Sequence, residues 1–236
     1  MTPGPLLQQY LVHPAIGLTL RATFLSMVLQ LLIGLPVGLY LAGRKNLWRA
    51  VSEIMVTLPM IFPPMALGFF LLLLLGKNGL IGHFFLNVFH LKIIFSFWGV
   101  LVATFIVGLP FMAKSVQAAR QQLDNSLIEA ASTLGKTRWQ ITRRVVLPNI
   151  RNGILAGVLL SFGRSVGEVG ITLMLGGNII GRTETLSLAI YNAVFEGEFK
   201  QAAIFSVILS ILSILILFVL NFINRNKIPN FSMNRK

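Results

Sequence analysis

Long apolar runs separated by short polar stretches dominate the pattern of this chain. Four runs hold no charged residue and reach the length of a membrane-spanning helix, about 20 residues: residues 22–43, 54–76, 93–113 and 201–224. A fifth run, residues 152–176, is apolar but interrupted by Arg164 and Glu168. The pattern therefore predicts an all-α fold, a polytopic bundle of about five transmembrane helices.

The composition supports a membrane protein. Hydrophobic residues make up 55% of the chain and charged residues 11%, whereas soluble domains carry about 25% charged residues. The net charge of +13 raises nucleic acid as a partner, but the basic residues lie between the apolar runs and form no basic face. We therefore expect a lipid bilayer and no nucleic acid as partners, and a single transmembrane domain over residues 1–236.

The distribution of Lys and Arg between the runs predicts the orientation, because cytoplasmic loops collect positive charge. One side holds 14 of these residues, namely Arg44, Lys45, Arg49, Lys114, Arg120, Lys136, Arg138, Arg143, Arg144, Arg151, Arg225, Lys227, Arg235 and Lys236. The other side holds 5, namely Arg21, Lys77, Lys92, Arg182 and Lys200. The first side is predicted to be cytoplasmic, which places the C-terminus inside and, with five spans, the N-terminus outside. The N-terminal stretch lacks the features of a cleaved signal peptide.

Small residues and prolines predict how the spans pack. Three glycine pairs have the G-x-x-x-G spacing that lets membrane helices approach closely: Gly34 and Gly38, Gly153 and Gly157, Gly163 and Gly167. Residues 63–64 are both proline, so the second span should kink or break there. Two interpretations of that kink are open: an irregularity of packing, or a helix bent around a transport path.

Two apolar segments on the predicted outer side, residues 80–91 and 185–195, are too short to cross a membrane. Such lengths suit re-entrant or interfacial segments. They form either an outer gate or plain interfacial helices. Residues 176–178 (Gly-Gly-Asn), before Arg182, are either a docking surface for a soluble binding protein or an ordinary loop.

A polar, basic stretch lies on the predicted cytoplasmic side, within a loop at residues 120–150; we call residues 126–148 the elbow. Ser126 and Glu129 have the spacing of a capping box, which predicts the start of a first helix. Gly135 is a natural helix stop. Thr137 and Gln140 form a second capping box and predict a second helix. The elbow should therefore be two short helices joined by a turn.

The second helix of the elbow is expected to reach about Val146, where Pro148 ends it. One apolar face is predicted across both helices, made of Leu127, Ile128, Ala131, Leu134, Trp139 and Ile141. Such a shape suits a knob that fits a groove in a partner.

The elbow resembles the EAA loop of the membrane permeases of binding-protein-dependent ABC importers. Glu129-Ala130-Ala131, Gly135 and Val145-x-Leu147-Pro148 follow the pattern E-A-A-x3-G-x9-I-x-L-P, with valine in place of isoleucine. The resemblance implies a type I permease fold in which the elbow docks on a separate ATPase subunit. The residues given that coupling role are Glu129, Ala130, Ala131, Gly135, Lys136, Arg138, Trp139, Leu147 and Pro148.

The resemblance covers about residues 14–222. Residues 58–82 and 163–194 are similar to molybdate permeases, and tungstate and sulfate permeases share much of this pattern. The resemblance implies a permease for a tetrahedral oxyanion in a bacterial or archaeal cell membrane, with molybdate first and tungstate or sulfate/thiosulfate as alternatives. It also implies a homodimer with a second permease copy, ABC ATPase subunits, and an external oxyanion-binding protein.

No catalytic, metal or cofactor site is predicted. Cysteine is absent, and residues 134–137 resemble a Walker A tail only superficially, because the required glycine is replaced by Ala130. The chain is therefore not expected to be an enzyme, and ATP hydrolysis belongs to a partner chain. A stand-alone channel or ion-coupled carrier is the rival class, although carriers often show inverted repeats and none is visible here.

Arg164 and Glu168 lie one helical turn apart inside the fifth run, on one helix face. Ionisable groups within a span usually face the bundle interior or a water-filled cavity. Two interpretations follow. The residues form an ion pair that stabilises packing, or Arg164 presents positive charge to an anion on the substrate pathway.

Overall fold

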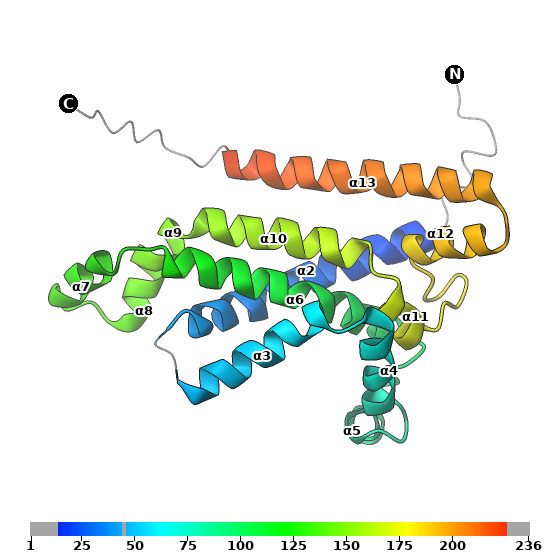
Figure 1. Cartoon of the computed structure of the whole chain (residues 1–236), viewed down its shortest axis with the longest axis horizontal. Helices are drawn as coiled ribbons and strands as arrows, with labels where there is room; N and C mark the ends of the chain where they lie inside the picture. The colour runs from blue at the N-terminus through cyan, green and yellow to red at the C-terminus, as the bar shows by residue number, and fades with distance from the viewer. Residues whose placement is uncertain (1–13, 44–45, 226–236) are drawn as a thin grey trace.

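The computed structural model describes residues 14–43 and 46–225, and every regular element in that part of the chain is helical (Figure 1). The helices are α2 (Pro14–Leu41), α3 (Leu47–Ile61), α4 (Pro64–Leu75), α5 (Leu80–Phe89), α6 (Phe97–Gln121), α7 (Asn125–Thr133), α8 (Arg138–Ile141), a π-helix (Thr142–Val146), α9 (Leu147–Asn149), α10 (Arg151–Val166), α11 (Gly170–Gly176), α12 (Leu186–Phe195) and α13 (Phe199–Arg225). The predicted outside N-terminus and the basic residues Arg44, Lys45, Lys227, Arg235 and Lys236 lie outside the described residues.

Within the described residues, three helices, α2, α6 and α13, are long and apolar enough to cross a membrane alone. Two bent pairs bring the number of candidate spans to 5 when each pair counts as one. Helices α3 and α4 meet at 119°, and the segments Arg138–Asn149 and Arg151–Val166 meet at 70°. The predicted all-α bundle of about five spans is therefore confirmed, as is the break at residues 63–64.

The charge-free runs predict helix ends at charged residues, and the observed helices differ from this. Arg21 lies inside α2, and Glu53 lies inside α3, which begins at Leu47. Glu53 forms an ion pair with Lys114 of α6, and the side-chain amide of Gln117 donates a hydrogen bond to it over 3.2 Å. Because its charge is paired between two helices, Glu53 is accommodated within a helix that continues past it.

The fifth predicted run is not one helix. Helix α10 ends at Val166 and α11 begins at Gly170, so a non-helical break divides residues 152–176. Helix α11 turns away from the axis of α10 (Figure 1). The two charged residues that interrupt the predicted run lie at this division, with Arg164 in the last turn of α10 and Glu168 in the break itself. Hydropathy alone does not indicate the break, because it reports burial of the segment and not the continuity of its backbone hydrogen bonds.

Helices α2 and α10 both pack closely on α6, and two of the three glycine pairs make this possible. A Cβ atom on Gly38 would lie 2.5 Å from the carbonyl oxygen of Ala113, and one on Gly153 would lie 2.2 Å from the Cβ of Ala119. A Cβ atom on Gly163 would meet nothing within 4 Å. The third pair therefore serves no helix contact within the described chain.

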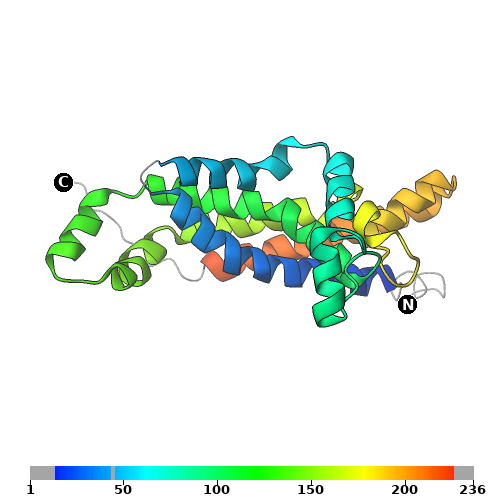
Figure 2. The same ribbon diagram turned by 90° about the horizontal axis from the view of Figure 1, so that it is seen from below.

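The described part of the chain holds three clusters of buried apolar side chains, one of them formed by Ala15, Leu186, Ala189 and Phe205. The other two lie at opposite ends of the bundle, and α6 contributes to both. The core near the elbow contains Met112, Val116, Ala131, Ile141, Val146 and Ile150. The core at the other end contains Leu67, Leu75, Ile93, Ile94, Ala103, Val107, Ile171 and Leu175. The two predicted short apolar segments are helices α5 and α12 at that second end (Figures 1 and 2).

Candidate functional site

The elbow projects from one end of the bundle, with α7 and α8 farthest from the other helices (Figures 1 and 2). Its first helix begins at Asn125, one residue before the predicted start. The N-cap is Asp124, whose Oδ1 accepts a hydrogen bond from the backbone N–H of Ser126 at 2.9 Å. This hydrogen bond lowers the pKa of the Asp124 carboxyl. The predicted capping box of Ser126 and Glu129 is wrong, because a carboxylate two residues earlier caps the positive end of the helix.

Gly135 makes the turn between the two helices. Its φ of +71° lies in the left-handed region, which glycine adopts without steric strain. The N–H of Lys136 donates to the carbonyl oxygen of Ala131 at 3.3 Å, and the N–H of Gly135 donates to that of Ser132 at 3.0 Å. These two bonds form a Schellman motif, so the predicted helix stop at Gly135 is confirmed.

The second capping box is confirmed as well. The backbone N–H of Gln140 donates to Thr137 Oγ1 at 3.3 Å, and the backbone N–H of Thr137 donates to Gln140 Oε1 at 3.1 Å. Pro148 does not end this helix, however. The chain stays helical through a π-helix and α9, and Pro148 lies in the first turn of α9, where its missing N–H is not required. The break follows at Ile150.

The predicted apolar face of the elbow is divided in two. Ala131 and Ile141 are buried and belong to the core that the elbow shares with α6. Leu127, Leu134 and Trp139 point away from that core and are 44%, 76% and 71% exposed. One part of the face therefore anchors the elbow to the bundle, and the other presents apolar side chains to a partner.

The residues predicted to couple to an ATPase are mostly accessible. Ala131 is buried and Leu147 is half-buried, and the exposed ones are Glu129, Ala130, Gly135, Lys136, Arg138, Trp139 and Pro148. Arg143 and Arg144 are exposed beside them. The free surface of the elbow is thus apolar side chains surrounded by positive charge.

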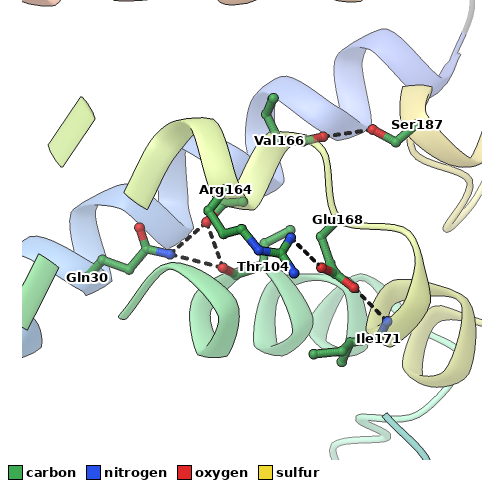
Figure 3. A network of polar contacts seen from close by, with 8 residues as sticks. Gln30, Thr104, Arg164, Val166, Glu168, Ile171 and Ser187 are labelled. Atoms are coloured by element: carbon green, nitrogen blue, oxygen red, sulfur yellow. Dashed lines mark hydrogen bonds and ion pairs between the residues drawn. The ribbon is translucent and has the colours of Figure 1, made fainter. Parts of the chain in front are cut away.

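Arg164 and Glu168 form an ion pair (Figure 3). Arg164 Nη1 lies 2.7 Å from Glu168 Oε2, and the other carboxylate oxygen accepts a hydrogen bond from the N–H of Ile171 at 2.8 Å. The Glu168 side chain is 2% exposed, whereas that of Arg164 is 34% exposed. The carboxylate is therefore committed to protein contacts, and the guanidinium retains an accessible surface.

A buried polar network that the sequence analysis missed joins the three central helices (Figure 3). Gln30 Nε2 on α2 donates to the carbonyl oxygen of Thr104 on α6 and to Ser165 Oγ on α10, both at 2.9 Å. Ser165 Oγ donates in turn to the Thr104 carbonyl oxygen at 2.8 Å. A Cβ atom on Gly108 would lie 2.2 Å from Gln30 Nε2, so this glycine makes room for the amide. The available signal was a lone glutamine in the middle of a charge-free run.

The Gly-Gly-Asn loop at residues 176–178 is tied to α12. Gly177 has a φ of +75°, and Asn178 Nδ2 donates to Asn192 Oδ1 at 2.6 Å. Asn192 Nδ2 donates to Glu184 Oε1 at 2.8 Å. Arg182 is exposed at the tip of the same loop. The loop is thus held in place by side-chain hydrogen bonds, and both interpretations of it stay open.

Comparisons with known proteins agree with the family resemblance and with the fold. Residues 34–231 match the family described as "Binding-protein-dependent transport system inner membrane component". The chain is 33% identical over 207 residues to the molybdenum transport system permease protein ModB of Haemophilus influenzae, covering 86% of this chain and 90% of that one. It is 37% identical over 203 residues to the sulfate transport system permease protein CysW of Synechocystis sp., covering 86% and 73%.

The fold is similar to a chain of the MetNI methionine ABC transporter in inward-facing conformations. The TM-score is 0.73 at 24% sequence identity, with 97% of this chain and 100% of that chain covered. At this identity the likeness concerns the fold alone.

Proposed function

Because the chain belongs to the family of binding-protein-dependent transport system inner membrane components, we propose that it is the permease subunit of an ABC importer for a tetrahedral oxyanion, with molybdate as the first candidate. The chain itself is a non-catalytic transmembrane subunit. The proposal of an oxyanion as substrate rests on the similarity to molybdenum and sulfate permeases over 86% of the chain. Tungstate and sulfate/thiosulfate are the alternative substrates, since the molybdenum and sulfate relatives share similar sequence identity with this chain, 33% and 37%.

The elbow is the proposed contact for the ATPase subunits. Its exposed Leu127, Leu134 and Trp139 supply an apolar anchor of the kind that seats a helix in a groove. Exposed Lys136 and Arg138 favour an acidic rim around that groove. The buried part of the elbow packs on the ends of α6 and α10, so a force on the exposed part reaches the spans through close-packed side chains.

The transport cycle follows from this connection. ATP binding on the partner chains draws the two elbows of a homodimer together, and the attached spans turn the path from one side of the membrane to the other. An external binding protein delivers the anion to the end opposite the elbow, where α5, α12 and the loop at residues 176–178 lie. The accessible guanidinium of Arg164 is proposed to offer positive charge to the anion along the path.

The rival class, a channel or ion-coupled carrier, differs in what moves solute. The chain is to be reconstituted in proteoliposomes with and without its ATPase subunits and given an external binding protein and labelled molybdate. We expect ATP-dependent uptake only with the ATPase subunits, with competition by unlabelled tungstate and sulfate showing which oxyanion is preferred. Uptake by the isolated chain would assign it to the rival class. Competition by uncharged solutes alone would exclude an oxyanion.

A further inference from the structure

Side chains hydrogen-bond to a backbone group of each helix end at the break between α10 and α11. The carbonyl oxygen of Val166, in the last turn of α10, accepts a hydrogen bond from Ser187 Oγ of α12 at 2.7 Å. The N–H of Ile171, in the first turn of α11, donates to Glu168 Oε1 at 2.8 Å. Side chains thus replace the helical hydrogen bonds that the break removes. Figure 3 shows both replacements beside the central polar network.

Glu168 is the residue that joins the two helices across the break. One of its carboxylate oxygens is paired with Arg164 on α10, and the other is bonded to the N–H of Ile171 on α11. The residue is 3% exposed. A buried carboxylate is costly unless it is paired and hydrogen-bonded, so Glu168 holds both partners at fixed positions.

Helix α11 packs closely against α4, the second half of the bent pair α3–α4. A Cβ atom on Gly68 of α4 would lie 3.0 Å from the Cβ of Met174. A Cβ atom on Gly170 of α11 would lie 3.0 Å from the Cβ of Pro64. Two helices at such close approach have no room to slide independently, so a displacement of α11 is passed to α4.

We propose that Glu168 is a positioning residue that carries the movement of α10 across the break to α11, and through α11 to α4, so that α4 and α11 move as one unit. This inference rests on the proposed transport function. Arg164 does not supply this link on its own, because its ion pair across the break is with Glu168 and not with α11.

The first test concerns the unit of α4 and α11. The chain has no cysteine, so the pair Gly68→Cys and Met174→Cys introduces the only thiols. The two Cβ positions, 3.0 Å apart, need to separate by about 0.8 Å to suit a disulfide, whose Cβ atoms lie about 3.8 Å apart. We expect the cross-link to form in membranes holding the permease alone, and the cross-linked transporter to take up oxyanion at a rate close to that of the reduced one. Loss of uptake on oxidation, restored by reductant, would show that α4 and α11 move apart and would overturn the proposal.

The second test concerns Glu168 in the complex with its ATPase subunits. Glu168→Gln keeps an acceptor for the N–H of Ile171 but removes the charge that pairs with Arg164. We expect uptake per ATP hydrolysed to fall severalfold, because α11 no longer follows α10, with the KM for the anion unchanged. Glu168→Gln with full uptake, or with uptake and ATP hydrolysis lost together, would contradict a coupling role.

Two further variants separate this role from a simple ion pair and from a charge on the path. Exchanging the charges, Arg164→Glu with Glu168→Arg, restores an ion pair but leaves Ile171 without an acceptor, and we expect no recovery; recovery would overturn the proposal. Arg164→Lys should recover uptake per ATP hydrolysed relative to Arg164→Gln, because lysine restores the positive charge beside Glu168. A KM for the anion that changes with no change in uptake per ATP hydrolysed would assign Arg164 to the path and not to the link. If the proposed function itself fails, the unsubstituted complex takes up no oxyanion, while the cross-linking result still stands.

Discussion

Gly135 has a backbone conformation that residues with a side chain rarely adopt. At a φ of +71°, a β-branched residue is disfavoured by about 1–2 kcal/mol. A Cβ atom there would meet nothing within 4 Å, so the effect of a substitution is on the backbone and not on packing. Gly135→Val should therefore distort the turn between α7 and α8, uncouple ATP hydrolysis from uptake, and leave the amount of protein in the membrane unchanged.

The matched control for that substitution is Gly135→Asn, because asparagine adopts positive φ more readily than other residues. Uptake and ATP hydrolysis are measured for both variants in the reconstituted complex. We expect Gly135→Asn to retain most of the coupling. Full transport by Gly135→Val would count against a role of the elbow in coupling.

Single residues also show where sequence reasoning is sound and where it is not. Gly135 and Thr137 were predicted correctly because their effects are local: a positive φ and a capping box depend on a few neighbouring residues. Glu53 and Gln30 were misjudged because their partners lie 61 and 135 residues away in the chain, on Lys114 and Ser165. A polar residue in an apolar run reveals that it needs a partner but not which one.

At the scale of helices, the glycine pairs make a prediction about stability. Gly38→Ala places a methyl group 2.5 Å from the carbonyl oxygen of Ala113, so α2 and α6 must separate. Overpacking of this kind costs about 1–3 kcal/mol. Gly163→Ala is the control in the same spacing motif, since its methyl group meets nothing within 4 Å and gains up to about 1 kcal/mol of helix propensity.

Thermal unfolding of the two variants in detergent or lipid checks this difference. We expect Gly38→Ala to lower the unfolding temperature and Gly163→Ala to leave it unchanged or raise it. Equal stability of the two variants would show that the α2–α6 contact is looser than the distances indicate.

The number of membrane spans was predictable from the sequence, whereas the continuity of the helices was not. Apolar length alone identifies spans, because about 20 residues are needed to cross the hydrocarbon core. The break at residues 63–64 was predictable because two consecutive prolines interrupt a helix. The break at residues 167–169 has no proline, and it persists because Glu168 and Ser187 supply the hydrogen bonds that the helix gives up. Such compensation depends on the fold and is invisible in a local pattern.

At the scale of the whole molecule, the two apolar cores to which α6 contributes indicate different roles for the two ends. The elbow end combines a core with exposed apolar and basic side chains, which suits a partner that exerts force. The other end combines a core with the break between α3 and α4, the break between α10 and α11, and the short helices α5 and α12. Helix α6 runs through both, so it is the rigid connection between them (Figure 1).

The same division of the molecule makes the orientation testable. The elbow end contains Lys136, Arg138, Arg143 and Arg144, and the last turn of α13 lies toward that end (Figure 1). A reporter fused after Lys236 should therefore report cytoplasm, because positively charged segments are retained on that side of the membrane. A second reporter inserted at Gly197, an exposed turn with a φ of +80° between α12 and α13, should report the outside. The two signals must be opposite because α13 is a candidate span between them. If both signals are reversed, the elbow lies outside the cell, where no ATPase subunit can reach it. That result would remove the basis of the proposed coupling.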